Sequence, residues 1–191
     1  SPASNTTYTV TVTNSNGCSA ISGAITNTVT ALPVPTLVSS DPDNTACSGS
    51  PVTFTAGGGT LFNFRVNGTS VQNGSSSTYT TSTLTNGQSV DVVVTNAGGC
   101  SSVSTAIVTT INSLPTPTLV SSDPDNTFCS GTTVTFTAGG GTGYNFRING
   151  VSVQNGSSDT FATSSLTNGQ QVDVVVVNAN GCSSTSPAIT N

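Results

Sequence analysis

The feature of this sequence that most constrains its fold is an exact internal repeat. The ten residues TLVSSDPDNT stand at 36–45 and again at 118–127, 82 positions later. The same shift carries NFRVNG at 63–68 onto NFRING at 145–150. Self-similarity at a fixed period marks an array of structural units. A period of 82 residues is long enough for an independent domain and too long for one coil of a solenoid.

The repeat also sets the expected domain organisation. Residues 1–31 align with the back part of a unit, so we expect them to supply the last two strands, F and G, of a truncated repeat. Residues 32–113 form one full repeat, and residues 114–191 form a second whose last strand is incomplete. The sequence therefore reads as part of a longer periodic protein, and its lack of a visible signal peptide or membrane segment carries no information.

Composition favours strands over helices. The chain contains no Glu, Lys or Met, which are among the best helix formers, whereas Thr and Val are abundant. Only 5% of the residues are charged, and the net charge is −5 with two cations in all. Such a chain has no electrostatic attraction for nucleic acid or for anionic membranes. We expect no nucleic-acid partner and no membrane insertion.

Hydrophobic residues alternate with polar ones at the period of a β-strand. In PVTFTA at 51–56, Val52 and Phe54 are expected to face a core, and Thr53 and Thr55 to face solvent. The same alternation predicts these further inward sets: Phe62, Phe64 and Val66; Val90, Val92 and Val94; Val134 and Phe136; Tyr144, Phe146 and Ile148; Val172, Val174 and Val176; and, in the opening segment, Tyr8, Val10 and Val12.

Asn-Gly pairs punctuate these strands. Both residues tolerate the positive φ angles of tight hairpins, so each pair predicts a strand reversal. The pairs stand at 16–17, 67–68, 73–74, 86–87, 149–150, 155–156, 168–169 and 180–181. About seven short strands per unit with such turns predict an all-β fold, namely tandem immunoglobulin-like β-sandwich domains in an elongated array. The segments LPVPT at 32–36 and LPTPT at 114–118 are expected to be stiff linkers.

Three motifs carry a resemblance to a known group of proteins. They are CSGSPVTFTA at Cys47–Ala56, FNFRVNG at Phe62–Gly68 and VDVVVTNAGGCSS at Val90–Ser102, with copies at 129–138, 144–150 and 172–184. The pattern resembles the tandem Ig-like and PKD-like repeats of large Bacteroidota cell-surface proteins, which include gliding-motility adhesins exported by the type IX system. One departure is that the strand position often held by Trp in those repeats is Phe64 or Phe146 here.

The resemblance implies a structural repeat of a long extracellular filament or cell-surface adhesin, which serves as a rigid stalk or fibre body. The expected partners are neighbouring repeats of the same chain and identical chains in a fibre. The alternative is a carbohydrate- or surface-binding module that uses repetition for avidity, with surface glycans as its partner. An accessory domain of a secreted hydrolase is a third interpretation.

Two cysteines per repeat indicate disulfides in a secreted protein. Pairing within a repeat would join Cys47 to Cys100 and Cys129 to Cys182. In an Ig-like sandwich, however, these cysteines lie at opposite ends of a strand about 23 Å long, whereas bridged Cα atoms lie within about 7 Å. We therefore favour Cys47–Cys182, a bond across repeats, and keep the pairing within repeats as the alternative. The partner of Cys18 is expected outside this sequence.

The DPDN loops are the one candidate for a metal. They bring carboxylate and amide oxygens together, the ligand type that Ca²⁺ prefers. The residues are Asp41, Asp43, Asn44, Asp123, Asp125 and Asn126. The spacing of an EF-hand is absent, and the alternative that we favour is a proline-fixed turn with Asx hydrogen bonds. No other cofactor is expected.

Three valines are expected on the outer face of their strands: Val93, Val175 and Val177. Apolar residues on an outer sheet face mark either ordinary strand filler or a lateral contact between chains. Arg65 and Arg147 occupy equivalent outward positions, where pairing with a neighbouring Asp is the simplest expectation.

An enzyme is not expected. The chain contains no His, so the usual Ser-His or Cys-His activation of a nucleophile is missing. No Lys is present for a Schiff base. The Asp residues crowd single loops or lie on strands, which is a poor arrangement for the two carboxylates of a glycosidase. AGGGT at 56–60 lacks the Gly-Lys-Ser/Thr ending of a phosphate-binding loop and is interpreted as the connection between strands B and C.

Overall fold

The computed structural model describes residues 4–191, and every regular element within them is a β-strand. Two compact units divide the described chain. The first comprises residues up to 40 together with 53–79 and 89–107, and the second comprises 41–52, 80–88 and 108–191. One end of the first repeat thus belongs to the same compact unit as the whole second repeat. The domain boundaries at 31/32 and 113/114 stay a prediction.

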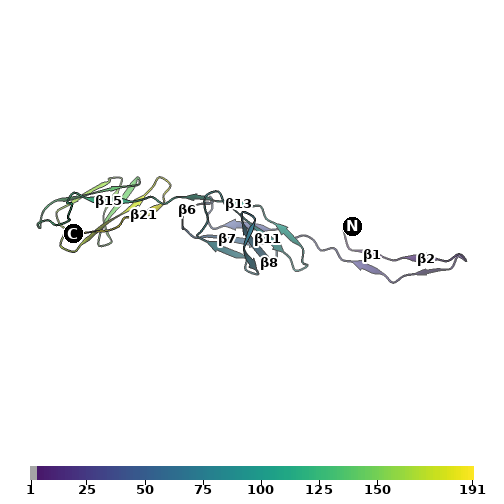
Figure 1. Cartoon of the computed structure of the whole chain (residues 1–191). Helices are drawn as coiled ribbons and strands as arrows, with labels where there is room; N and C mark the ends of the chain where they lie inside the picture. Colours follow the sequence, from purple (N-terminus) through teal and green to yellow (C-terminus); the bar gives the residue numbers. More distant parts are fainter. Residues whose placement is uncertain (1–3) are drawn as a thin grey trace. The chain divides into compact units, whose positions relative to one another are not determined.

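The second repeat is a two-layered sandwich. One antiparallel sheet has the order β15-β16-β19, and the other has the order β18-β17-β20-β21, with β22 also paired to β20 (Figure 1). The bounds are β15 Thr118–Ser121, β16 Val134–Gly139, β17 Gly143–Ile148, β18 Val151–Gly156, β19 Thr160–Thr163, β20 Gln171–Val177, β21 Ser183–Thr185 and β22 Ile189–Thr190.

Alternate residues of the two sheets meet in one core, as the sequence predicted. Phe136 from the first sheet and Phe146 from the second are both fully buried. Phe161 of β19 lies against each ring, with centroids 6.4 Å from Phe136 and 5.6 Å from Phe146. Burying each such ring contributes about 1.5–3 kcal/mol. Ile148, at the end of its strand, packs on this core but is only partly buried.

The first repeat copies this arrangement. Its sheets have the orders β10-β7-β5 and β12-β11-β8-β9, with β13 paired to β11. Tyr79 contacts both Phe54 and Phe64, at centroid distances of 6.4 and 5.7 Å. The bounds are β5 Thr36–Ser39, β6 Thr45–Cys47, β7 Val52–Gly57, β8 Leu61–Val66, β9 Thr69–Gly74, β10 Thr78–Thr81, β11 Ser89–Thr95, β12 Ser101–Val103, β13 Ile107–Val108 and β14 Thr110–Asn112.

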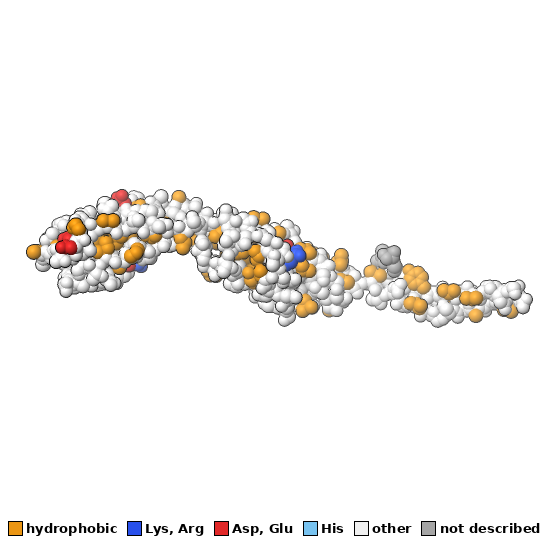
Figure 2. All heavy atoms as spheres, viewed as in Figure 1, with side chains coloured by type: hydrophobic (Ala, Val, Ile, Leu, Met, Phe, Trp, Pro, Cys, Tyr) orange, Lys and Arg blue, Asp and Glu red, His pale blue; other side chains and the backbone are white. Residues whose placement is uncertain are grey.

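The opening segment departs from the sequence expectation. It forms a two-stranded ribbon in which β1 Thr6–Tyr8 pairs with β4 Ile25–Asn27, and β2 Thr11–Thr13 pairs with β3 Ser19–Ile21 (Figure 1). Its expected inward residues Tyr8, Val10 and Val12 are 48%, 60% and 66% exposed. Figure 2 shows hydrophobic side chains at the surface of this ribbon. The prediction of their burial was wrong, because two strands alone have no facing sheet to pack on.

The Asn-Gly predictions hold at some positions and fail at others. Asn67 and Gly68 both have positive φ, 48° and 78°, and reverse the chain between β8 and β9. Asn73 and Gly74, in contrast, form the end of β9, where Asn73 pairs with Asn63. The pair at 155–156 likewise ends β18. The prediction of a turn at these two Asn-Gly pairs was wrong because the chain reverses just after each pair, through a Ser-rich turn.

Candidate functional site

A short parallel strand pair forms where the first repeat continues into the second. β14 pairs with β6, with Thr110 opposite Thr45 and Asn112 opposite Cys47. The amide of Thr110 donates to the carbonyl of Asn44 at 2.8 Å, and the amide of Ser48 donates to the carbonyl of Asn112 at 2.8 Å. All these residues belong to the second compact unit. The strand pair therefore belongs to the first repeat and lies where the chain of that repeat leads into the linker at 114–118.

The disulfide of this junction is the one that the sequence favoured. Cys47 and Cys182 are bonded, with their Cα atoms 5.6 Å apart, and Cys182 is 1% exposed. The alternative pairs within a repeat do not form, since Cys100 and Cys129 are free. Cys18 is free and exposed in the structure, and its pairing with a cysteine outside this sequence stays a prediction.

Hydrogen bonds fix the linker backbone against the hairpin that carries the second cysteine. The side-chain amide of Asn178 donates to the carbonyl of Ser113 at 2.9 Å. In the first compact unit, Asn96 makes the equivalent bond to the carbonyl of Ala31 at 2.8 Å. The linker prolines are buried at Pro33 and Pro115. These linkers are therefore docked segments and not free spacers, which sequence reasoning missed.

The glycines of the AGGGT loops make this docking possible. A Cβ on Gly140 would lie 2.1 Å from the carbonyl oxygen of Thr116, and one on Gly58 would lie 2.1 Å from that of Val34. Both glycines also have φ near +96°, which other residues rarely adopt. The loop lies between the B and C strands as predicted. The sequence signal for this contact between loop and linker was that three consecutive glycines and a proline-containing linker recur together in both repeats.

The DPDN loops form Asx turns. The Asp43 carboxylate accepts the amide of Thr45 at 3.0 Å, and the Asp125 carboxylate accepts that of Thr127 at 3.1 Å. Asn44 and Asn126 adopt the left-handed region, with φ of 57° and 55°. These hydrogen bonds are the ones expected for a proline-fixed Asx turn. Calcium binding by Asp41, Asp43, Asn44 and their copies Asp123, Asp125 and Asn126 stays a prediction.

The two carboxyl groups of each loop lie close enough to interact. Burial, followed by a hydrogen bond with Asp43, raises the pKa of Asp41. In the second repeat, a hydrogen bond from Asp123 lowers the pKa of Asp125. Among residues 4–191, no group of three or more His, Cys, Asp or Glu side chains is placed to hold a metal.

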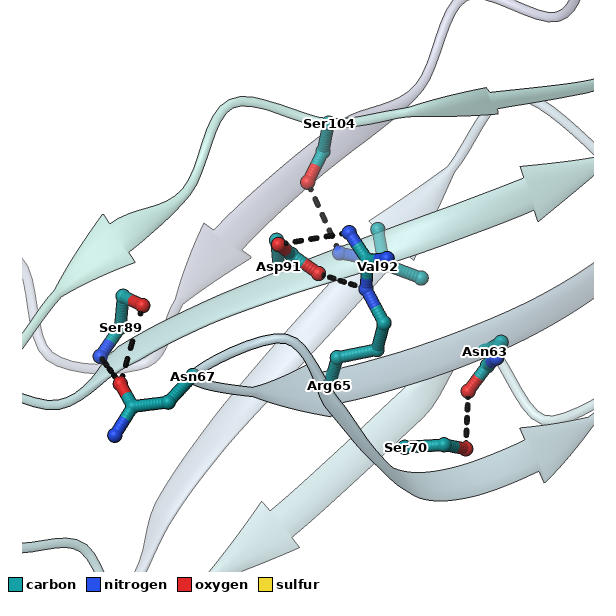
Figure 3. Close-up of polar contacts among 8 residues, drawn as sticks. All are labelled: Asn63, Arg65, Asn67, Ser70, Ser89, Asp91, Val92 and Ser104. Carbon is teal, nitrogen blue, oxygen red and sulfur yellow. Dashed lines mark hydrogen bonds and ion pairs between the residues drawn. The ribbon is translucent and has the colours of Figure 1, made fainter.

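The two arginines pair with aspartates on the neighbouring strand, as expected. Figure 3 shows Arg65 of β8 reaching across to Asp91 of β11. Its Nε and Nη2 donate to the two carboxylate oxygens at 2.6 and 2.9 Å. Arg147 and Asp173 repeat these distances. The bidentate bond to Asp91 raises the pKa of Arg65. Both cations of the chain are therefore engaged within their own sheets.

The candidate lateral-contact valines are half-buried in their sheets. Val93 lies between Asn63 on β8 and Val103 on β12. Val175 and Val177 of β20 have partners on both sides in the same way. Neighbouring side chains therefore cover part of each valine. A contact between chains through Val93, Val175 and Val177 stays a prediction.

Comparisons with known proteins find only distant structural likenesses. No protein-family model matches the chain, and no curated protein matches it. The fibronectin(III)-like modules of Clostridium thermocellum CbhA align with a TM-score of 0.46 at 12% identity, over 80% of this chain and 91% of theirs. The FN1–FN3 domains of chicken CNTN1 align with a TM-score of 0.40 at 15% identity, over 97% of this chain and 74% of theirs. These likenesses are too distant to support more than the strands themselves show.

The order of the strands and the core that lies between the two sheets of a repeat define the structural class of this protein. It is an all-β protein built of immunoglobulin-like sandwiches that recur along the chain. No helix within residues 4–191 is long and apolar enough to cross a membrane.

Proposed function

We propose that this chain is a structural, non-catalytic repeat from the body of a long extracellular filament or cell-surface adhesin. The observation that carries the proposal is the junction of Cys47 with Cys182. There a covalent bond joins the two repeats, beside the β14–β6 strand pair of the first repeat. A module whose task ended with its own fold would need no covalent bond to its neighbour. A module whose task is to transmit force to that neighbour is served by one.

The spacing of the disulfide supports this mechanical role. Cys47 and Cys182 are 135 residues apart, whereas the repeat period is 82 residues, as from Cys47 to Cys129. Equivalent bonds in a longer array would therefore overlap along the sequence. Tension on the chain would pass through the sulfur atoms and bypass residues 48–181. The sandwiches inside that loop would then not unfold under load.

The disulfide also supports an extracellular or cell-surface location, because such bonds persist in oxidising environments. The sequence resemblance to the repeats of large Bacteroidota surface proteins points the same way. The docked linkers at Pro33 and Pro115 fit a stalk better than a flexible tether, because a bent linker would lose the hydrogen bonds of Asn96 and Asn178.

Glycan binding is the weaker candidate. Sugar-binding sites commonly stack the sugar ring on an exposed aromatic side chain. Among the described residues, Tyr8 is the only aromatic side chain that is largely exposed, and the ribbon that carries it has no facing sheet. We therefore do not propose a carbohydrate site.

Immunogold electron microscopy of intact cells that make this protein tests the proposal. Antibodies raised against the chain should label thin filaments that extend from the cell surface. Label confined to the cytoplasm or to soluble secreted enzyme would contradict it. Binding of the chain to a glycan array with defined sugar preference would favour the carbohydrate-binding alternative.

A further inference from the structure

The backbone of Asn112 lies beside both cysteines of the junction disulfide. Asn112 is opposite Cys47 in the β14–β6 pair, and its carbonyl accepts the amide of Ser48 at 2.8 Å. The same carbonyl oxygen lies 4.0 Å from the Sγ atom of Cys182. The strand pair thus fixes Cys47 next to this carbonyl. Cys182 comes from a hairpin of the second repeat, so it needs a contact of its own to reach the same place.

The side chain of Asn178 supplies that contact. Its Nδ2 atom donates to the carbonyl of Ser113 at 2.9 Å, and its Oδ1 atom accepts the amides of Asn180 and Cys182, both at 3.0 Å. The backbone amide of Asn178 also donates to the carbonyl of Cys182 at 2.9 Å. A carboxamide has both a donor and an acceptor, whereas an ionised carboxylate of the same length only accepts. One side chain therefore holds the cysteine with its oxygen and the linker with its nitrogen.

The first repeat has the same hairpin without a disulfide. There the Oδ1 atom of Asn96 accepts the amides of Gly98 and Cys100, both at 3.0 Å, and its Nδ2 atom donates to the carbonyl of Ala31 at 2.8 Å. Cys100 is free in the structure. The hairpin and its contact with the linker therefore do not depend on the disulfide, and around Cys182 the same contacts can be made before the bond forms.

The repetition of the cysteines makes such a contact useful for selecting a partner. By the repeat period, Cys100 has the same hairpin position as Cys182, and Cys129 has the same position as Cys47. Cys100 is also nearer to Cys47 in the sequence than Cys182 is, and closing a shorter loop costs less entropy. A contact that brings Cys182 to the carbonyl of Asn112 therefore favours the bond across repeats over its competitors.

We propose that Asn178 is the positioning residue of the junction disulfide. By binding the carbonyl of Ser113, it holds Cys182 next to Cys47 and speeds the step that closes the bond. The covalent bond then forms after the linker has docked, so it joins only repeats whose junction is already folded. This inference rests on the proposed structural function and describes how the junction of that structure is made.

The covalent step requires an oxidant, and a low-molecular-weight disulfide such as oxidised glutathione is sufficient. The thiolate of Cys47, the more exposed of the two cysteines, attacks one glutathione sulfur and releases the other glutathione. The thiolate of Cys182 then attacks the Cys47 sulfur of this mixed disulfide and displaces the second glutathione. One protein disulfide forms, one glutathione disulfide is reduced to two thiols, and two protons pass from the cysteines to them. Asn178 acts on the second step, because only that step needs both cysteines together.

Quenched oxidation of the reduced, refolded chain separates the two steps. Replacing Cys18, Cys100 and Cys129 by Ser leaves the junction pair as the only thiols. Mass spectrometry then follows the glutathione adduct and the closed disulfide with time. Asn178→Asp keeps the acceptor of the hairpin bonds and loses the donor to Ser113. We expect the adduct to form at an unchanged rate and the closing step to slow about 2- to 10-fold, as the loss of one hydrogen bond implies.

The matched control is Asn96→Asp, because Asn96 makes the same contacts in a hairpin that takes no part in the bond. It adds the same charge and should leave both rates unchanged. Asn178→Ala removes the hairpin acceptor as well and should close at least as slowly as Asn178→Asp. With all five cysteines present, oxidation during refolding should give a larger share of Cys47–Cys100 peptides in Asn178→Asp than in the parent chain.

Three results would overturn the proposal. One is closure of Asn178→Asp at the rate of the parent chain, and another is equal slowing in Asn96→Asp. The third is loss of the fold in the reduced Asn178 variants, seen by circular dichroism, which would make the residue a requirement of folding instead. None of these results bears on immunogold labelling of surface filaments, so failure of the positioning role and failure of the proposed function can be told apart.

Discussion

Cys47 and Cys182 are bonded across 135 residues of sequence, with their Cα atoms 5.6 Å apart. The hairpin cysteine of the second repeat is thereby joined to the strand β6 of the first. β14 is hydrogen-bonded to β6 and is followed by the linker that Asn178 holds. The disulfide, the strand pair and the linker form one structure, and the stability of the junction should depend on all three.

Removal of the disulfide should destabilise the second compact unit. In the chain-entropy model, a closed loop of this length stabilises the folded state by about 5 kcal/mol. We expect Cys47→Ser with Cys182→Ser to lower the free energy of unfolding by 2–5 kcal/mol, about the usual cost of a lost native disulfide. Urea unfolding under oxidising conditions measures this. The matched control is Cys18→Ser with Cys100→Ser, which should change nothing, and an equal loss in both double variants would contradict the account.

Gly140 should be intolerant of a side chain. The variant Gly140→Ala places its Cβ against the carbonyl of Thr116 at a positive φ, so the linker must shift. We expect a loss of about 1–3 kcal/mol in the free energy of unfolding. Gly156→Ala is the control, since that glycine has open space around it and an ordinary φ. It should be neutral or stabilise the fold by about 0.4–1 kcal/mol. Equal effects of the two variants would show that the linker is not docked.

The ion pair of Arg147 and Asp173 should contribute little despite its geometry. Both side chains are partly exposed, 26% and 19%, so water screens the pair. A double-mutant cycle with Arg147→Ala and Asp173→Ala should give a coupling energy of about 0.2–1 kcal/mol. The pair of Arg65 and Asp91 supplies a matched repetition and should give the same value. A coupling several times larger would mean that these sheet faces are covered in solution.

The acidic loops should respond to pH with opposite signs. The pKa of Asp125 is lowered, so its contribution to stability is present above the ordinary Asp value and is lost as pH falls through the folded value. The pKa of Asp41 is raised, so its contribution is present at low pH and is lost as pH rises. NMR titration of the carboxyl carbons should place Asp41 above Asp125. Equal midpoints would contradict the opposite pKa shifts of these two carboxyl groups.

The same loops give a test for calcium. The Asx turns already employ the carboxylates of Asp43 and Asp125, and we expect millimolar calcium to leave the melting temperature unchanged. A rise in melting temperature that Asp43→Asn and Asp125→Asn remove would establish the metal site instead. Those two variants keep the oxygen that accepts the turn hydrogen bond, so the turn itself remains intact.

Strict alternation made most of the fold predictable. The buried residues of β7, β11 and β20 alternate along each strand because both sheets turn one face to a core. The alternation could not show that Tyr8, Val10 and Val12 have no facing sheet. The residue pattern of one strand carries no information about whether a second sheet packs against it. Strand length disfavoured a disulfide within a repeat, since an extended strand separates the two ends of a sandwich. The disulfide across repeats followed from the further expectation that the ends of successive repeats meet.

The docked linker was harder to predict. The close approach of Thr116 to Gly140 is a contact between backbone atoms, and backbone atoms leave no hydrophobic pattern in the sequence. The strand β14 was missed for a related reason. Its three residues are too few to show a period, and its partner β6 lies near the other end of the same repeat in the sequence.

Pulling single oxidised chains from both ends by force spectroscopy tests the central claim most directly, because the claim concerns how the junction transmits force. With Cys47 bonded to Cys182, residues 48–181 should add no contour length at any force below that of bond rupture, and a reductant should release them. An oxidised chain that extends to the full length of its 191 residues would contradict the account.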